Sequence, residues 1–591
     1  MTDFVPPLKD MLFAVHHLSG LDKVLKIERF GDFDVDTIDQ VIEEAGKFAA
    51  EVLSPINIPG DQAGSKLVDG GVIAAPGFAD AYEKFMENGW QSLDVDPEYG
   101  GMGMPGIVAA AAMESWQAAC LSFSLAPMLT GGAVWAIDAH GSTEIRNKFL
   151  PSMASGAWTG TMNLTEPQAG SDLSVVATKA VPEDGHYLIS GSKIFITWGD
   201  QEFSENVIHL VLARLPDAPE GVRGLSLFAV PKFLINADGS IGERNDVYVA
   251  GIEHKLGIHA SPTCVMSFGE KGGATGYLVG EENKGLACMF TMMNHARIAV
   301  GIQGLGISER AYQQARAFAL DRKQGRAPGI KGSVTIVHHP DVRRMLMLMK
   351  SQVEAMRAVA YYTAGVVDLA HFSTDDSQRE RAARRTALLT PVVKAWATET
   401  AQEITSLGVQ VHGGMGFVEE TGAAQHMRDA RILTIYEGTT GIQAMDFAGR
   451  KVLADEGRAM NELLADLRSL DEQLAGDERL LGIRSALGEG AQQLDAATKW
   501  LVEHGGLDPN AAGSASVNYL MLAGVVAGGW QMARASLAII DGAVNDDPAF
   551  AAAKLLTTEF YARHVLPRAS AYFTAAVAGS NTVMMLPEES F

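Results

Sequence analysis

One glutamate in the last third of the chain is preceded by mostly apolar residues and followed directly by a glycine. Glu437 follows Ile432, Leu433, Ile435 and Tyr436, and it precedes Gly438 and two threonines. A carboxylate in apolar surroundings loses hydration, which raises a carboxyl pKa. A base that removes a proton from carbon needs such a raised pKa. A lone glutamate in this position is also compatible with a solvated group at a helix start, so both interpretations stay open.

Three further segments place small and polar groups where they can reach a ligand. Residues 163–172 (NLTEPQAGSD) form a tight polar loop that can direct N–H and hydroxyl groups at a ring edge or a phosphate. In 193–200 (KIFITWGD), Phe195 alternates with Thr197, and a flat cofactor can lie on that strand face. In 410–420 (QVHGGMGFVEE), three glycines permit close backbone approach. Alone, these segments also fit a capped turn, a strand with one core face and a helix end.

The elements that must position these segments change type twice along the chain. The first part is mainly helical; residues 36–53 carry apolar side chains at helical spacing, and we expect Pro55 to end that helix. Short β-branched and aromatic runs then indicate strands at 186–197, 206–215 and 224–233. Helical patterns return afterwards and continue to the end.

This order predicts an α+β multidomain fold, because a strand module between helical blocks differs from a βαβ alternation. No GxGxxG follows a predicted strand and opens a helix, which argues against a Rossmann dinucleotide site. The expected domains are an N-terminal helical domain (1–158), a middle antiparallel β domain (159–280), a helical domain (281–450) and an additional C-terminal helical domain (451–591).

Composition excludes several classes of protein. With 47 Lys and Arg against 71 Asp and Glu, the net charge of −24 argues against general nucleic-acid binding, but not against a small anionic ligand in a basic pocket. Three distant cysteines without a CxxC pair predict a reducing cytoplasm. The N-terminal text lacks a secretory pattern, the final LPEESF is no peroxisomal address, and the apolar stretch 108–113 is too short to span a membrane.

Taken together and in this order, the segments resemble the signatures of the acyl-CoA dehydrogenase family. TEPQAGSD (165–172) is similar to the first signature. QVHGGMGFVEE, followed by RDARILTIYEGTTGIQ (428–443), is similar to the second signature and the catalytic segment. The resemblance covers about 30–450 and implies the family fold with FAD as cofactor. It also implies that Glu437 takes the alpha proton of an acyl-CoA while the FAD N5 receives the beta hydride, which gives a trans-2-enoyl-CoA.

The resemblance further implies which residues hold the cofactor and the substrate. Thr165 would bond the pyrimidine edge of the flavin, Thr197 would lie near N5, and Arg322 would meet the pyrophosphate across a dimer. Ser171 and Arg297 match positions that bind the CoA portion. The full set of matching FAD positions is Met162, Leu164, Thr165, Phe195, Thr197, Arg322, Gln410, Gly414, Thr439 and Gly441.

The length and the opening MTDFVPPLKDML resemble a long bacterial subgroup of the family. The resemblance implies 3-methylmercaptopropionyl-CoA, an intermediate of dimethylsulfoniopropionate breakdown, as substrate and methylthioacryloyl-CoA as product. It also implies an electron-transferring flavoprotein as acceptor. In long members the added helical block covers the surface that otherwise makes a tetramer, so a homodimer is expected. The alternatives are a general fatty acyl-CoA dehydrogenase of β-oxidation, an acyl-CoA oxidase and a non-catalytic scaffold.

Overall fold

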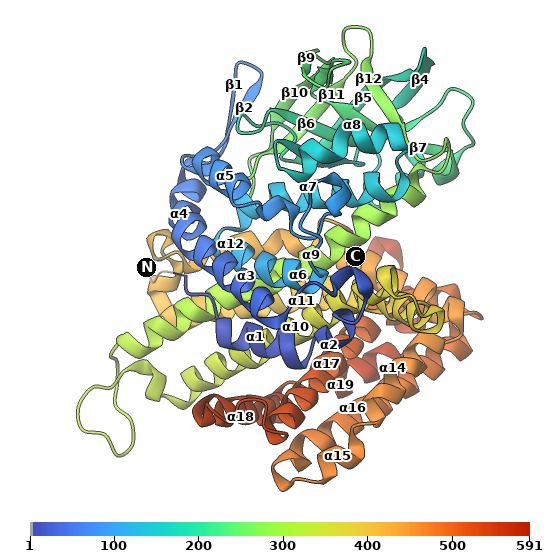
Figure 1. The fold of residues 1–591 in the computed structure, drawn as a ribbon. Coiled ribbons are helices and arrows are strands. Elements are labelled where there is room, and N and C mark those ends of the chain that lie inside the picture. The colour runs from blue at the N-terminus through green and yellow to red at the C-terminus, as the bar shows by residue number, and fades with distance from the viewer. Residues whose placement is uncertain (1–3) are drawn as a thin grey trace. The chain divides into compact units, whose positions relative to one another are not determined.

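The computed structural model describes residues 4–591, which form two compact units. The helical unit consists of the chain up to Glu44, Pro105–Ala118 and Val300–Phe591. The sheet unit consists of Ala45–Met104 and Ala119–Ala299. Figure 1 shows the strands of the main sheet in shades of green and the late helices of the helical unit in orange and red. The structure thus confirms the mixed helix and sheet architecture that the sequence predicts.

The sheet unit is built on an eight-stranded sheet within the described residues, with the order β10-β11-β5-β12-β7-β6-β3 and β4 paired to β5 and β6. Its neighbours are antiparallel except that β3 and β4 pair in parallel with β6. The three predicted strand runs form β5, β6 and β7. The bounds are β3 Trp158–Asn163, β4 Lys179–Glu183, β5 His186–Thr197, β6 Asn206–Arg214, β7 Leu225–Pro231, β10 Val247–Ile252, β11 Thr263–Phe268 and β12 Ala274–Val279.

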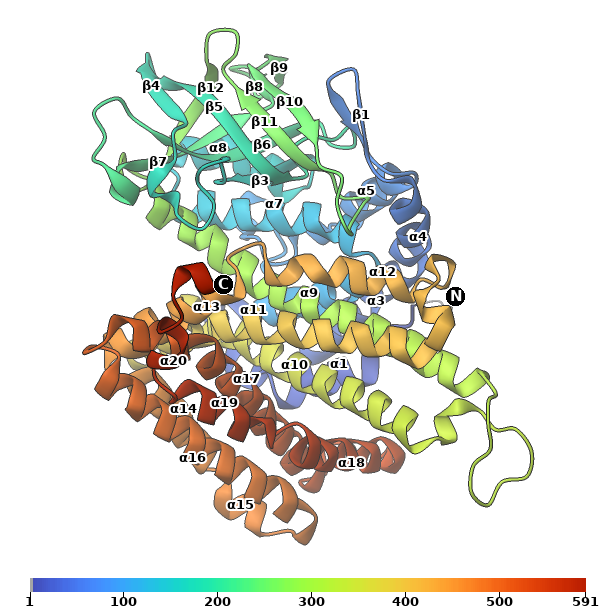
Figure 2. The ribbon, with the colours of Figure 1, turned by 180° about the vertical axis from the view of Figure 1, so that it is seen from behind.

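The core of this unit explains why its strands contain continuous runs of aliphatic residues. Along β6 and β7 almost every side chain is buried on both faces, which suits continuous aliphatic runs. Val211, Phe228 and Ile189 lie in one buried apolar cluster of the sheet. The helix α7 (Leu121–His140) packs against β3, as Figure 2 shows, and α8 (Thr143–Ala154) packs against α7.

The helical start of the sheet unit differs from the prediction in two ways. The expectation that Pro55 ends the helical segment is wrong: α3 (Val35–Phe48) leads through a π-helical turn into α4 (Ser54–Ala63). Pro55 lies in the first turn of α4, directly after the π-helical turn, in which the N–H of Ser54 donates to the carbonyl of Ala49. A short hairpin, β1 (Lys66–Val68) with β2 (Gly71–Ile73), then precedes α5 (Phe78–Glu87).

The helical unit is organised around long helices. The helices α10 (Pro340–Phe372) and α11 (Asp376–His412) form an antiparallel pair, and α9 (Gly285–Asp321) enters the unit from Val300 onward. Figure 2 shows these three helices running side by side. The remaining long or site-bearing helices are α1 Leu8–His17, α6 Gly106–Ala119, α12 Ala423–Ala430, α13 Thr440–Met445, α14 Arg458–Arg468, α16 Leu481–His504, α17 Pro509–Ile540, α18 Pro548–His564 and α19 Arg568–Ala576.

The C-terminal block is centred on α17. This helix packs against α10, α11, α16, α18 and α19. Among the described residues it is the one helix long and apolar enough to cross a bilayer by length and composition. Because 72% of its apolar window is buried by other parts of the structure, it also meets the description of a core helix.

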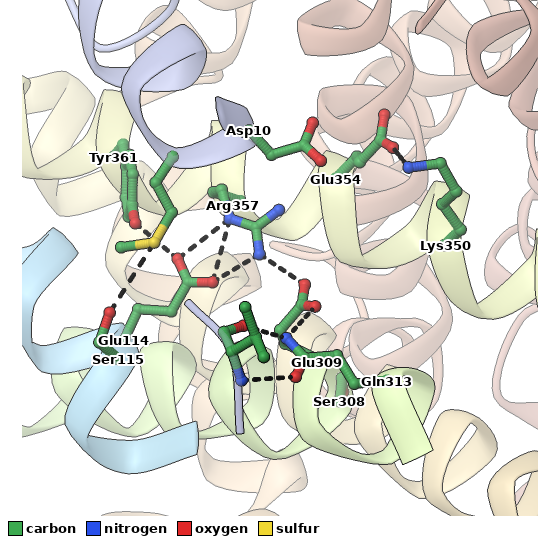
Figure 3. Close-up of polar contacts among 12 residues, drawn as sticks. Asp10, Glu114, Ser115, Ser308, Glu309, Gln313, Lys350, Glu354, Arg357 and Tyr361 are labelled. Carbon is green, nitrogen blue, oxygen red and sulfur yellow. Dashed lines mark hydrogen bonds and ion pairs between the residues drawn. The ribbon is translucent and has the colours of Figure 1, made fainter. Parts of the chain in front are cut away.

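Buried ion pairs join the N-terminal, central and C-terminal helices of the helical unit, and Figure 3 shows the pairs that Arg357 makes. Arg357 on α10 binds Glu114 of α6 at 2.6 Å and Glu309 of α9 at 2.7 Å. The hydroxyl of Tyr361 donates to Glu114 at 2.6 Å. Lys554 on α18 pairs with Asp10 of α1 and with Glu354 of α10. A buried carboxylate is unfavourable unless a cation or hydrogen-bond donors replace its lost hydration. The partners here lie on helices far apart in the chain, and each pair therefore also links those helices.

Candidate active site

Glu437 lies in a turn with unusual backbone geometry. The turn connects a 3-10 segment, Arg431–Thr434, to α13. Glu437 has φ +54° and Gly438 has φ +89°. A side chain other than glycine rarely adopts the left-handed region, and such strain persists where the surrounding structure holds it. The half-buried Glu437 is therefore held in its conformation by its neighbours.

Two side chains fix this turn by hydrogen bonds to its backbone, and a third caps the helix that follows it. Lys394 Nζ donates to the carbonyl of Gly438 at 2.7 Å. Gln443 Nε2 donates to the carbonyl of Glu437 at 3.0 Å. The Thr439 hydroxyl accepts from the N–H of Ile442 at 3.2 Å and so caps α13. The orientation of Glu437 is thus set by contacts to both sides of the turn.

The residue before the glutamate keeps its proton. Burial, followed by the charge of Glu437, raises the pKa of Tyr436 well above its ordinary value. The neutral phenol donates a hydrogen bond to the side-chain oxygen of Gln303 on α9. Leu433 is fully buried, whereas Ile435 is 47% exposed. The apolar residues that precede Glu437 therefore lie partly in the core and partly at the surface.

In the sheet unit, Phe195 lies at an irregularity of β5. The register of β5 against β11 shifts between Lys193 and Ile196, and Phe195 has φ +60°. The alternation of side chains between the two faces of the strand is interrupted there, because a bulge adds a residue to one strand and turns its side chain. Phe195 is 57% exposed, which is uncommon for a large aromatic residue. Thr197, two residues on, is half-buried and pairs with Thr263.

The first signature is bonded directly to this strand. The N–H of Ile194 donates to the carbonyl of Thr165 at 2.9 Å. Lys193 Nζ donates to the carbonyl of Leu164 at 3.0 Å. Met162 is the last residue but one of β3, just before this loop, and is almost fully buried. The structure therefore brings two of the predicted segments together beside Phe195.

The buried pair Glu166–Lys193 anchors that junction, and sequence reasoning did not single it out. Lys193 Nζ lies 2.8 Å from Glu166 Oε1, with exposed side-chain fractions of 0% and 3%. Burial alone would raise the pKa of Glu166, but the charge of Lys193 and several hydrogen bonds lower it to about 2. Burial lowers the pKa of Lys193 to about 8 against the opposing effect of Glu166. The sequence did contain an indication of this pair, because segments 163–172 and 193–200 each include one of the two charged residues.

The exposed groups at this junction fit a flat, conjugated ring with polar edges. Phe195 offers an aromatic side chain, while the half-buried Thr165 and Thr197 offer hydroxyl groups. An aromatic surface with a few polar groups is the usual lining for a ring cofactor. The residues present therefore fit the flavin of FAD.

The other predicted residues lie at several places. Arg322 follows the end of α9, Gln410 lies in the last turn of α11, and Gly414 lies in the 3-10 segment after that helix; all three are exposed. The rings of Phe318 and His412 lie 4.5 Å apart and join these two helix ends. Thr439 and Gly441 flank the start of α13.

The two residues assigned to CoA differ in exposure. Ser171 is exposed in the loop after β3, next to Asp172, whose side chain accepts from the N–H of Ser174. Arg297 on α9 is buried, with Nη1 3.4 Å from the side-chain oxygen of Asn294.

Comparisons with known proteins identify the family. Family models match in chain order: the acyl-CoA dehydrogenase N-terminal domain at 36–157, the middle domain at 161–270, the C-terminal domain at 283–452 and an acetyl-CoA dehydrogenase C-terminal-like domain at 447–587. The chain belongs to the acyl-CoA dehydrogenase family and is an oxidoreductase with FAD as its cofactor. The predicted family, fold class and cofactor are thereby confirmed.

Among its relatives is the 3-methylmercaptopropionyl-CoA dehydrogenase of Ruegeria pomeroyi, which is 47% identical over 570 residues and covers 96% of both chains. A butyryl-CoA dehydrogenase of Syntrophomonas wolfei is 35% identical over 620 residues and covers 100% of this chain and 99% of the relative. The FAD complex of an acyl-CoA dehydrogenase from Bacillus anthracis has the same fold, with a TM-score of 0.74, 21% identity and coverage of 97% and 93%.

Proposed function

We propose that this acyl-CoA dehydrogenase oxidises 3-methylmercaptopropionyl-CoA to methylthioacryloyl-CoA, with Glu437 as the base. The observation that carries the assignment of the base is the left-handed turn at Glu437, which buried donors hold in place. Support for the substrate comes from the relative of that name, which is similar to this chain over nearly its whole length.

In this proposal the turn provides two groups for one reaction. The Glu437 carboxylate takes the proton alpha to the thioester carbonyl. The backbone N–H of Glu437 donates to the carbonyl oxygen and stabilises the enolate charge that develops there. FAD, when bound, supplies the acceptor for the beta hydride. The protein's part is to hold the base at the alpha carbon and to exclude water.

The predicted contact residues extend the proposal. Thr165, Phe195 and Thr197 bind the flavin ring, with Met162 and Leu164 lining it. Ser171 and Arg297 bind the CoA portion. The remaining FAD contacts are Arg322, Gln410, Gly414, Thr439 and Gly441. The domain limits at 158, 280 and 450 also stay a prediction, since the structure divides the chain differently, into two units.

We also propose an electron-transferring flavoprotein as the acceptor, a homodimer as the assembly and the cytoplasm as the compartment. An acyl-CoA oxidase with the same base would instead pass its electrons to oxygen. Oxygen consumption during turnover without another acceptor would identify that alternative.

A substrate panel with a matched variant tests this function. Wild type and Glu437→Gln are loaded with FAD and assayed on methylmercaptopropionyl-, butyryl-, octanoyl- and palmitoyl-CoA with an artificial acceptor. We expect the highest kcat/KM for the thioether substrate and a decline with chain length, since one methylene changes binding by ~1–3 kcal/mol. Glu437→Gln should keep FAD and bind the thioesters, but lose roughly 10³-fold in turnover, because it removes the proton acceptor.

Three results would contradict the proposal in separate ways. Wild-type turnover in Glu437→Gln would show that another residue is the base. A clear preference for octanoyl- or palmitoyl-CoA would leave the base intact and replace the thioether substrate with a general fatty acyl-CoA. Flavin that no thioester bleaches would point to the non-catalytic scaffold.

A further inference from the structure

Two fully buried polar side chains reach the backbone of the turn that carries Glu437. Lys394 on α11 and Gln443 on α13 each have 0% exposure. The ammonium of Lys394 binds the carbonyl of Gly438, and the amide of Gln443 binds the carbonyl of Glu437. Consecutive carbonyls of one strained turn are therefore held from two different helices.

A buried ammonium is costly for a protein, so its position requires an explanation. Removing a charged group from water is unfavourable unless hydrogen bonds replace the lost hydration. A charge-assisted bond such as Lys394 to the Gly438 carbonyl, at 2.7 Å, is roughly twice as strong as a neutral one. This bond exists only while the peptide after Gly438 keeps its present orientation. It therefore stabilises the turn against relaxing into an ordinary conformation.

The glycine confirms how tightly the turn is packed on Gln443. A Cβ built on Gly438 would lie 2.6 Å from Gln443 Nε2, and its φ of +89° disfavours any other residue. On the far side, the Thr440 hydroxyl donates to Glu399 Oε1 of α11 at 2.6 Å. The helix α11 thus contacts the turn through two residues that lie five positions apart.

We infer that Lys394, assisted by Gln443, is a positioning residue that holds Glu437 in its left-handed conformation for proton abstraction. The inference rests on the proposed role of Glu437 as the base. Because the carboxylate and the Glu437 N–H leave the same turn, loss of Lys394 displaces both groups at once. The chemical step should suffer more than the binding of FAD or substrate.

The variant Lys394→Met tests this, because it keeps the length of the side chain and removes the donor. We expect kcat to fall ~10–100-fold, since displacement of a reacting group by about 1 Å has effects of that size. KM should stay within about 3-fold and FAD content should be unchanged, as the substitution leaves the binding surfaces intact. The isotope effect on kcat with alpha-dideuterated 3-methylmercaptopropionyl-CoA, or butyryl-CoA if wild type oxidises it faster, should rise because proton abstraction becomes more limiting.

Further variants separate positioning from folding. Gln443→Met removes the second donor and should give the same pattern if Lys394→Met fails to fold. Lys394→Arg keeps a buried cation that can donate, and should recover part of the lost kcat. The matched control is Lys554→Met: Lys554 is 6% exposed and binds Asp10 and Glu354 instead of the turn. It should lower the melting temperature and leave the kcat of the folded protein unchanged.

Wild-type kcat and an unchanged isotope effect in folded, FAD-loaded Lys394→Met or Gln443→Met would overturn the inference. An equal loss of kcat in Lys554→Met would do the same, because it would reveal a general effect of destabilisation. Glu437→Gln distinguishes the role of the base from the positioning role. If Glu437→Gln is inactive while Lys394→Met is not, only the positioning role of Lys394 fails. If Glu437→Gln is active, the assignment of the base fails as well.

Discussion

Two of the residues assigned to the chemistry have a backbone that ordinary side chains avoid. Glu437 has φ +54° and Phe195 has φ +60°. Such conformations cost of order 1–3 kcal/mol each and persist only where the surrounding structure over-determines them. At Glu437 the determining contacts come from Lys394 and Gln443. At Phe195 they come from the bulge between β5 and β11 and from Lys193 beside it.

The Glu166–Lys193 pair makes stability depend on pH at this residue scale. The pKa of Glu166 is about 2 in the folded protein, below its ordinary value of 4.5. Its contribution is therefore fully present above pH 4.5 and is lost as the pH falls toward 2. The shift corresponds to about 3 kcal/mol in full, and about 1 kcal/mol of it should be gone by pH 4.

We expect Glu166→Gln to lower the melting temperature at pH 7 and to flatten its decline between pH 6 and pH 4. Differential scanning calorimetry of the FAD-loaded protein at several pH values measures both. Glu144→Gln is the control, since the Glu144 side chain is 81% exposed. A decline in Glu166→Gln as steep as that of wild type would show that other carboxylates cause the acid sensitivity.

At the scale of elements, the close approach of α17 to α11 depends on small residues. A Cβ built on Gly524 would lie 2.3 Å from Trp396 Cγ, and one on Gly528 would lie 2.3 Å from the Tyr561 hydroxyl oxygen. Both neighbours are buried side chains in the centre of the helical unit. Gly524 therefore sets the distance between α17 and α11, and Gly528 sets the packing of α18 on α17.

The variant Gly524→Ala should destabilise the protein by ~1–3 kcal/mol, because an extra methyl group in a filled core forces its neighbours to move. Gly513→Ala on the same helix is the matched control: its nearest neighbour would be Met445 Sδ, at 4.0 Å. That change should be neutral or slightly stabilising, since alanine favours helices over glycine. Thermal unfolding of both variants measures the difference, and equal melting temperatures would refute the packing argument.

At the scale of the whole molecule, the C-terminal block is an integral part of the helical unit. Lys554 of α18 binds Asp10 of α1, and Arg568 of α19 binds Glu403 of α11 at 2.7 Å. With α17 packed on α10 and α11, this block covers their surface. A covered surface is no longer available to another subunit, which supports the proposal of a homodimer rather than a tetramer.

Light scattering coupled to size-exclusion chromatography tests that assembly. We expect a mass of two chains of 62.9 kDa for the FAD-loaded protein at micromolar concentration. Arg322→Ala should weaken FAD retention without changing this mass, because Arg322 is proposed to contact the pyrophosphate. A stable mass of four chains would refute the role of the C-terminal block in limiting assembly.

The sequence by itself determined the family, the order of helical and strand segments and the candidates for base and cofactor binding. These follow from short stretches of sequence. They are motifs of eight to sixteen residues and runs such as 186–197, which forms β5 over that same range. Local patterns are read correctly where the residues that matter are neighbours in the chain.

Only the tertiary structure decided how those candidates are held. Lys394 lies 44 positions before Gly438, Glu166 lies 27 before Lys193, and Glu114 lies 243 before Arg357. No local pattern joins such partners, since a buried charge is recognised by what surrounds it in space. The helical path through Pro55 and the left-handed backbone of Phe195 and Glu437 likewise depend on packing, which overrides the preference of each residue type.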